Sequence, residues 1–171
     1  NPGFIAGNVS IAAGPGAVTE VLVTAGTASA SPNTDGDYLL SLEPGTYTVT
    51  VSLTGYHADP IPNVTVLAGI TTPDIDFALQ MLPLQPPVNL AVDAVTGIFN
   101  WEQPASSHQY YPGSYKVFLD GALLGITEEL DWTFTGLIPN TAYTAGVAGI
   151  YPTGESEPAT LEFTFTGVGI E

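Results

Sequence analysis

The chain has 171 residues and a formal net charge of -16, because 17 aspartate and glutamate residues are opposed by one basic side chain, Lys116. Nucleic acids, phosphate-bearing substrates and anionic lipid surfaces are bound through clusters of lysine and arginine, and this sequence has none. We therefore exclude nucleic acid as a partner and expect no clamp for a phosphate group.

The rest of the composition is typical of an extracellular β-rich module. Hydrophobic residues make up 44% of the chain, which is enough to build a core, and there is no cysteine for disulfides or thiolate chemistry. No run approaches the roughly 18 apolar residues that span a bilayer, so no membrane insertion is expected. The chain begins with Asn1 rather than methionine, as expected of a processed protein or a piece of a longer one.

Alternating apolar and polar residues predict strands along the first half. In residues 46–53, Tyr47, Val49, Val51 and Leu53 share one face, while threonine and serine occupy the other. A half-buried strand has this pattern, because successive side chains point to opposite faces of a sheet. Similar patterns predict strands at residues 4–12, 17–25, 37–42, 62–67 and 74–80, with glycine-rich turns between them.

A proline-rich stretch interrupts this rhythm. Three prolines, Pro83, Pro86 and Pro87, fall within five positions. Proline cannot donate a hydrogen bond to a strand ladder and favours an extended, fairly stiff connector. We therefore predict two domains, residues 1–82 and residues 83–171, whose relative orientation a short linker restricts.

The strand pattern resumes after the connector. Strands are predicted at residues 88–94, 97–102, 113–119, 132–136, 141–150 and 159–166. Several short strands separated by turns at regular spacing indicate a sandwich. The fold class predicted for the whole chain is therefore all-β, with two antiparallel Greek-key β-sandwiches in tandem.

The first half resembles the carboxypeptidase regulatory-like family, a small transthyretin-like sandwich. The resemblance covers most of residues 4–80 and is carried by the following segments: Ile5-Ala6-Gly7-Asn8-Val9, Thr34-Asp35-Gly36-Asp37-Tyr38-Leu39-Leu40, Leu42-Glu43-Pro44-Gly45-Thr46-Tyr47-Thr48-Val49, Gly55-Tyr56 and Ile75-Asp76-Phe77-Ala78-Leu79. In metallocarboxypeptidases this domain accompanies a zinc catalytic domain, for which the present sequence has no counterpart. The resemblance thus implies an accessory module.

The second half resembles a fibronectin type III domain of the bacterial secreted kind, over about residues 84–167. The segments that carry the resemblance are Pro86-Pro87-Val88-Asn89-Leu90, Trp101, Tyr115-Lys116-Val117-Phe118-Leu119-Asp120-Gly121, Phe134-Thr135-Gly136-Leu137, Thr141-Ala142-Tyr143-Thr144 and Gly154-Glu155-Ser156-Glu157. The resemblance implies that Trp101 is the core tryptophan. It also implies that Tyr143 is a corner tyrosine, with a hydroxyl bonded to the backbone upstream.

One segment has the residue types of a metal site. Asn33, Asp35 and Asp37 place side-chain oxygens at alternate positions, as a calcium-binding loop does. The same residues also suit a hairpin turn, and no glutamate follows at the spacing of an EF-hand. Both interpretations remain open, and the sequence suggests no cofactor other than calcium.

Other titratable residues match no catalytic pattern. Asp74 and Asp76 share one face of a predicted strand, which is typical of a solvated surface. His57 and His108 are isolated and form no zinc-binding motif. We therefore predict no catalytic residues and no enzyme activity. Mutual repulsion among so many carboxyl groups is expected to raise their pKa values.

Two groups of residues are predicted to contact partners. Tyr110, Tyr111 and Trp132 are aromatics outside the strongest core positions, where they could stack on a sugar ring or anchor a protein contact. The nearly uncharged end segments, with Phe4, Ile5, Phe165 and Val168, are predicted to pair with the strand edge of a neighbour.

These observations predict a non-catalytic extracellular module with a structural or adhesive role. It would be part of a modular cell-surface protein or the subunit of a surface filament. Its partners would be further copies of itself, as a homo-oligomer through strand pairing, or cell-surface proteins. The alternative is an accessory region of a secreted hydrolase that binds polysaccharide, which predicts a row of exposed aromatics on one sheet face.

Overall fold

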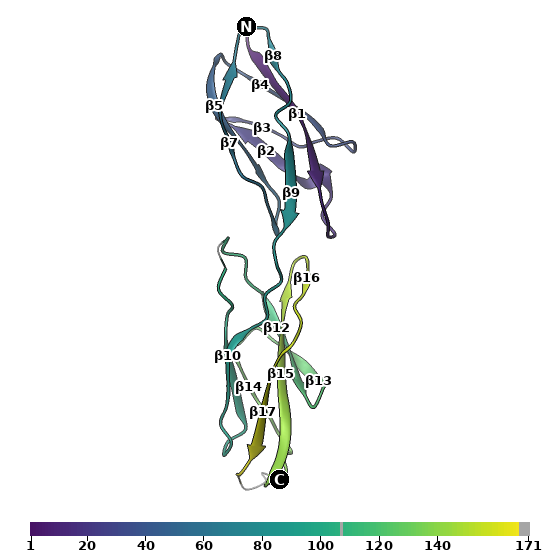
Figure 1. Cartoon of the computed structure of the whole chain (residues 1–171), viewed down its shortest axis with the longest axis vertical. Coiled ribbons are helices and arrows are strands. Elements are labelled where there is room, and N and C mark those ends of the chain that lie inside the picture. Colours follow the sequence, from purple (N-terminus) through teal and green to yellow (C-terminus); the bar gives the residue numbers. More distant parts are fainter. Residues whose placement is uncertain (107, 168–171) are drawn as a thin grey trace. The chain divides into compact units, whose positions relative to one another are not determined.

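The computed structural model describes residues 1–106 and 108–167. The chain forms two compact units, Asn1–Leu82 and Pro83–Glu171 (Figure 1). Each unit has its own hydrophobic core. Within the described residues, no helix has the length and apolar character needed to cross a membrane. The predicted all-β sandwich fold is confirmed.

The first unit packs two sheets against each other. One sheet has the strand order β4-β1-β9-β6, with β8 also paired to β1, and the other has the order β3-β2-β5-β7. The strands of the first sheet are β1 (Gly3–Ile11), β4 (Asp37–Leu42), β6 (Tyr56–His57), β8 (Thr71–Thr72) and β9 (Phe77–Met81). Those of the second are β2 (Leu22–Ala25), β3 (Ala28–Ala30), β5 (Gly45–Ser52) and β7 (Ile61–Val66).

The core of the first unit lies between these sheets. Ile5, Leu40 and Leu79 come from one sheet and Val23 and Val49 from the other, and each is at most 1% exposed. The alternation predicted for residues 46–53 places Val49 in this core, while its neighbour Thr48 is exposed on the outer face. Burial of apolar side chains from both sheets holds the sandwich together.

Strand β1 departs from the expected antiparallel pattern. It pairs antiparallel with β4 on one side, with Gly3 opposite Leu42. On its other side it runs parallel to β8 and then to β9, with Val9 opposite Phe77. The first and last long strands of this unit therefore lie side by side and point the same way (Figure 1).

Two predicted strands of the first unit are shorter than expected. Residues 18–20 form a 3-10 turn, η1 (Val18–Glu20), and the strand expected at 17–25 begins only at Leu22. The strand expected at 74–80 begins at Phe77, because Asp74 has a φ of 61°, which is incompatible with extended backbone.

The second unit packs a three-stranded sheet, in the order β10-β11-β14, against a sheet in the order β13-β12-β15, where β15 also pairs with β16 and β17. The strands of the first sheet are β10 (Val88–Val92), β11 (Ile98–Glu102) and β14 (Asp131–Thr133). Those of the second are β12 (Ser114–Leu119), β13 (Ala122–Thr127), β15 (Thr141–Tyr151), β16 (Gly154–Glu155) and β17 (Ala159–Phe165).

An aromatic cluster forms the centre of the second core. Phe99 is fully buried, and the centroid of its ring lies 5.1 Å from that of Trp101 and 5.6 Å from that of Phe134. Trp101 in turn packs edge-on against Tyr115, at 5.5 Å between centroids. Tilted and edge-on ring pairs of this kind add stability beyond the area that they bury.

Candidate functional site

The turn at residues 33–37 is organised by hydrogen bonds to its own backbone. The Asn33 side-chain oxygen accepts the backbone N–H groups of Asp35 and Asp37, each at 2.9 Å. The Asn8 side-chain amide on β1 donates to the Asp35 carbonyl and to the Asp37 carboxylate, both also at 2.9 Å. Asn33 and Asp37, two of the three predicted ligands, thus already accept protein N–H groups, in the manner of an Asx turn docked on β1.

The described residues contain no group of three or more histidine, aspartate or glutamate side chains placed to hold a metal ion. Calcium binding by Asn33, Asp35 and Asp37 stays a prediction. Asp76, which the sequence placed on a solvated face, accepts the backbone N–H of Asn8 at 2.7 Å. This bond ties the segment before β9 to β1.

Tyr38 is the most strongly perturbed titratable residue in the first unit. Its side chain is buried, and its hydroxyl donates to the Ile75 carbonyl at 2.6 Å. Burial raises the pKa of Tyr38 to about 12, and the negative charge of Asp76 acts in the same direction. The neutral phenol is therefore part of the contact between β4 and the segment that precedes β9.

We expect the first unit to lose stability in alkaline solution through this phenol. An unfolded tyrosine ionises near pH 10, whereas folded Tyr38 holds its proton to about pH 12. Its contribution is complete below the unfolded pKa and is lost as the pH rises through the folded value. Tyr38→Phe should lose about 1 kcal/mol at neutral pH with its hydrogen bond, yet show a flatter alkaline decline.

The measurement is the free energy of urea unfolding, followed by circular dichroism between neutral pH and about pH 12. The other tyrosines are the same in both proteins, so the difference between the two curves isolates Tyr38. Parallel curves for wild type and Tyr38→Phe would contradict the assignment.

Carboxyl repulsion does not govern Asp93, contrary to the sequence-based expectation. The Asp93 carboxylate accepts the backbone N–H groups of Val95 and Thr96 at 2.9 and 3.1 Å. These bonds favour the ionised form and lower the pKa of Asp93 below its usual value.

The three predicted contact aromatics have different surroundings. Tyr110 is half-buried, with its ring centroid 5.1 Å from that of Tyr151 and its hydroxyl 2.7 Å from that of Thr153. Trp132 is half-buried over Gly125, while Tyr111 is 39% exposed. Among the described residues, Tyr111 is the one exposed phenylalanine, tyrosine or tryptophan, so these residues form no row of exposed aromatics.

The end segments require a correction. The side chains of Ile5 and Phe165 are 0% and 3% exposed and belong to the two cores, so they cannot form a contact surface. Phe4 is half-buried, and β1 is paired on both sides, which leaves it no free edge for a neighbour. Val168 lies outside the described residues. An uncharged apolar run indicates burial, but it does not indicate whether the chain's own core or a neighbouring molecule covers it.

The corner tyrosine implied by the resemblance of the second half is present. The Tyr143 hydroxyl accepts the backbone N–H of Ile138, five residues upstream, at 2.9 Å. Trp101 is 3% exposed at the centre of the same core. Both features belong to sandwiches of the immunoglobulin and fibronectin type III architecture.

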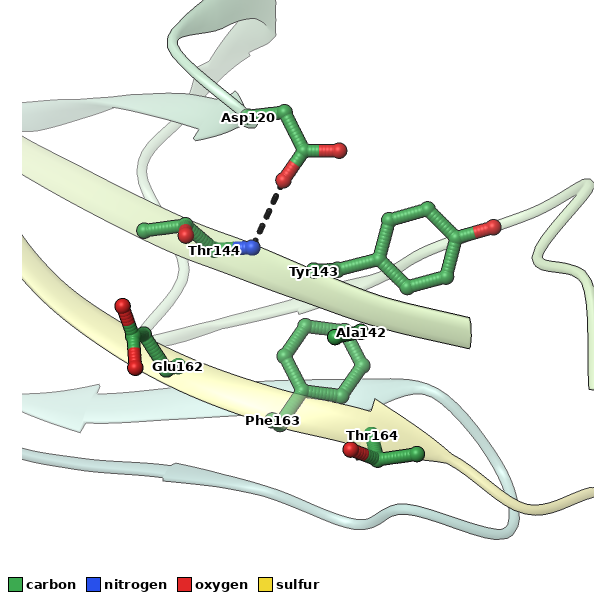
Figure 2. A pocket seen from close by; sticks show the side chains of 7 residues that line it. All are labelled: Asp120, Ala142, Tyr143, Thr144, Glu162, Phe163 and Thr164. Atoms are coloured by element: carbon green, nitrogen blue, oxygen red, sulfur yellow. Dashed lines mark hydrogen bonds between the residues drawn. The ribbon is translucent and has the colours of Figure 1, made fainter. Parts of the chain in front are cut away.

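A shallow hollow lies beside this corner. It is lined by Asp120, Ala142, Tyr143, Thr144, Glu162, Phe163 and Thr164 (Figure 2). The Asp120 carboxylate in it accepts the backbone N–H of Thr144 at 2.7 Å. The Asp120 side chain therefore binds the backbone of β15 beside the end of β12.

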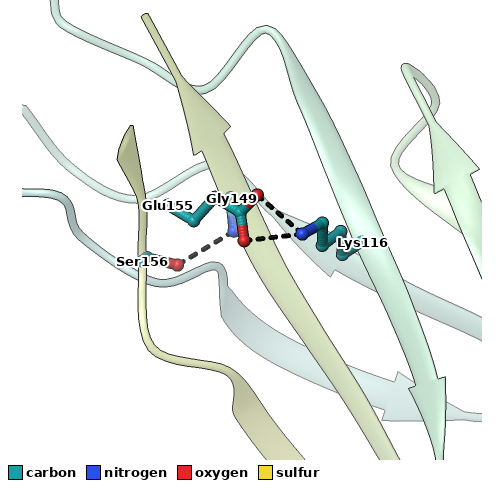
Figure 3. Close-up of polar contacts among 4 residues, drawn as sticks. All are labelled: Lys116, Gly149, Glu155 and Ser156. Atoms are coloured by element: carbon teal, nitrogen blue, oxygen red, sulfur yellow. Dashed lines mark hydrogen bonds and ion pairs between the residues drawn. The ribbon is translucent and has the colours of Figure 1, made fainter. Parts of the chain in front are cut away.

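The single lysine is held in an ion pair. Lys116 on β12 reaches both carboxylate oxygens of Glu155, at 2.6 and 2.7 Å (Figure 3). Beside this pair, Ser156 accepts the backbone N–H of Gly149. The histidines have carboxylate or hydroxyl neighbours: His57 lies 3.1 Å from Asp59, and the backbone N–H of His108 donates to Ser106.

Strand β13 is one of the surface strands that the sequence-based prediction missed. It follows Asp120 and Gly121, whose φ values of 49° and 80° form the tight hairpin turn typical of an Asp-Gly pair. That dipeptide, followed by an apolar run, was the available signal. Three side chains of this strand, Leu123, Leu124 and Ile126, are among the exposed aliphatic residues.

Comparison with known proteins finds one family model that is similar to the first unit. The model of the carboxypeptidase regulatory-like domain matches residues 5–80, which confirms the resemblance seen in the sequence. No curated protein matches the chain.

Several solved structures resemble the chain at low identity. One shows fibronectin(III)-like modules of CbhA from Clostridium thermocellum, with 13% identity, coverage of 95% of this chain and 91% of that chain, and a TM-score of 0.36. A second is the TIE protein of Bacillus anthracis, with 14% identity, coverage of 99% and 32%, and a TM-score of 0.37.

A third is a chain of a type II cohesin–X–dockerin complex from Acetivibrio cellulolyticus, with 20% identity, coverage of 46% of this chain and 58% of that chain, and a TM-score of 0.37. The present protein thus spans about a third of the B. anthracis chain and little more than half of the A. cellulolyticus chain. TM-scores at this level assign no function.

Proposed function

We propose that the chain is a non-catalytic module of an extracellular surface protein. The first unit is matched by the carboxypeptidase regulatory-like family, and the second resembles a fibronectin type III sandwich, and both support this proposal. Its role would be to carry tension between its two ends and to present an interaction surface. The composition supports this location, because charged residues make up only 11% of the chain, a balance that suits extracellular β-rich modules.

The observation that carries the proposal is the parallel pairing of the first and last long strands of the first unit. Backbone hydrogen bonds join the whole length of β1 to residues 70–79. At one end the Phe4 N–H donates to the Ile70 carbonyl, and at the other the Ala12 N–H donates to the Leu79 carbonyl. Tension enters this unit at the start of β1 and leaves at the end of β9. The two parallel strands are then pulled in opposite directions along their common axis.

In this geometry the hydrogen bonds between β1 and β9 resist the force together. When two strands are sheared, their cross-strand hydrogen bonds stretch together, whereas strands pulled apart from one end lose those bonds one at a time. The β1–β4 pair provides the opposite case within the same unit. It is antiparallel, with Gly3 opposite Leu42, so pulling residue 1 away from residue 43 unzips it.

The test is to pull the first unit in both directions by single-molecule force spectroscopy. The chain contains no cysteine, so handles can be attached uniquely at Asn1→Cys with Pro83→Cys, or at Asn1→Cys with Glu43→Cys. Both Pro83 and Glu43 are exposed, so neither handle disturbs a core. We expect a clearly higher unfolding force for the first pair. Equal forces would contradict a tension-bearing role.

A further inference from the structure

The outer edge of β13 combines backbone groups that no described strand pairs with and three exposed aliphatic side chains. β13 lies at the end of its sheet and pairs with β12 alone among the described strands. Its sequence from Ala122 to Thr127 contains no charged residue and no proline. Proteins usually protect edge strands with such residues, because an unprotected edge is a template for another strand.

The exposed side chains of this strand are large and apolar. Leu123, Leu124 and Ile126 are 53%, 45% and 57% exposed. On the neighbouring strand the half-buried Phe118 lies opposite Leu123, which extends the apolar surface inward from the edge. A strand added to this edge would cover these groups and gain the hydrophobic contribution of their burial.

The strand is held in place from its inner side. Gly125 faces the Trp132 ring so closely that a Cβ at this position would lie 2.7 Å from the ring. Trp132, on β14 of the opposite sheet, thereby packs against the inner side of β13. This contact holds the inner side of β13 in place, which lowers the entropic cost of ordering the strand on binding.

Acidic residues stand at both ends of the strand. Asp120 precedes β13, while Glu128, Glu129 and Asp131 follow it, and all four are exposed. The one lysine nearby, Lys116, is neutralised by Glu155. A bound strand would therefore have each of its ends beside negative charge, which complements a partner with basic residues flanking its apolar core.

The same charges argue against a second copy of this chain. In an antiparallel β13–β13 pair, Asp120 of one copy would lie toward Glu128 and Glu129 of the other, and each chain has a net charge of -16. Like charges placed opposite each other in a strand pair are destabilising.

We propose that the β13 edge binds, by strand addition, an extended segment of another protein in which alternate apolar residues are flanked by lysine or arginine. This deepens the proposed role as an interaction module and rests on it. It concerns the second unit, however, so the pulling experiment on the first unit can fail or succeed independently.

The probe is a synthetic peptide of alternating isoleucine and threonine with a lysine pair at each end. Methylation of every second backbone nitrogen leaves it one pairing edge and prevents it from pairing with itself. A second peptide with glutamate in place of lysine is the charge control. Binding to the full chain is followed by fluorescence anisotropy at low and high salt, and located by amide chemical shifts.

We expect the lysine peptide to bind about tenfold or more tightly than the glutamate peptide at low salt, with amide shifts concentrated on β13. Ile126→Lys should weaken binding of the lysine peptide by about tenfold. Ile138→Lys is the matched control, because Ile138 is 63% exposed and lies outside β13, so the added charge is the same. This variant should bind as wild type does.

Three results would overturn the proposal. They are the same affinity for both peptides, amide shifts that map to another strand, and equal effects of the two lysine substitutions. Sedimentation velocity supplies a fourth: a dimer that Ile126→Lys dissociates would make a second copy the occupant. If a variant folds poorly, the amide shifts that the lysine peptide causes in the wild-type chain still show whether it binds at β13.

Discussion

Replacing Phe99 with alanine should destabilise the second unit by about 3–5 kcal/mol, the largest effect expected from a single substitution in this chain. Phe99 is 0% exposed and contacts both Trp101 and Phe134, so truncation leaves a cavity that rigid rings cannot fill. Domains of this size are stable by only about 5–15 kcal/mol, so the change removes much of that margin.

Tryptophan fluorescence during urea unfolding measures this effect selectively. Both tryptophans, Trp101 and Trp132, lie in the second unit, so their signal reports on that unit alone. The matched control is Leu40→Ala in the core of the first unit, which should leave the tryptophan midpoint unchanged while lowering the circular dichroism transition. A fluorescence midpoint that Phe99→Ala leaves in place would show that the aromatic cluster does not stabilise this core.

Replacing Gly7 with alanine should destabilise the first unit by about 1–3 kcal/mol or more. A Cβ on Gly7 would overlap the backbone carbonyl of Ile75, and a backbone group cannot rotate away as a side chain can. The segment before β9 would have to move off β1, and the Ile75 N–H bond to Ala6 and the Tyr38 bond to Ile75 would be strained with it.

Gly113→Ala is the control for this substitution. Nothing lies within 4 Å of a Cβ at Gly113, and its backbone is not in the left-handed region. Its effect on the second unit should stay within about 0.5 kcal/mol, as for most surface substitutions. Unfolding by urea, followed by circular dichroism, gives both values. A Gly7→Ala chain as stable as wild type would mean that β1 and the Ile75 segment are not closely packed.

Local patterns predicted the features that depend on neighbouring residues. The alternation of Tyr47, Val49 and Val51 was enough to predict a strand with one buried face, because side-chain direction follows directly from extended backbone. The Tyr143 corner could likewise be inferred from a short motif, since its hydroxyl bonds only five residues upstream.

Features that depend on distant residues could not be predicted in this way. The parallel pairing of β1 with β9 joins residues almost seventy positions apart, and nothing in either segment specifies parallel rather than antiparallel pairing. Ile5 and Phe165 show the same limit, because apolar character indicates burial without naming the surface that covers it. The exposure of Ile126 depends on β13 lying at the end of its sheet, which is a property of the whole topology.

The proposed tension-bearing role depends on shear loading of the ladder between β1 and β9, and the unfolding force measured through residues 1 and 83 tests it most directly. Ala12→Pro removes the terminal bond from the Ala12 N–H to Leu79, while Ala13→Pro alters an equally exposed neighbour for which no such bond exists among the described residues. We predict a lower unfolding force for Ala12→Pro than for Ala13→Pro in this direction, and no difference when the chain is pulled through residues 1 and 43. The same force for both variants along the β1–β9 axis would contradict the account.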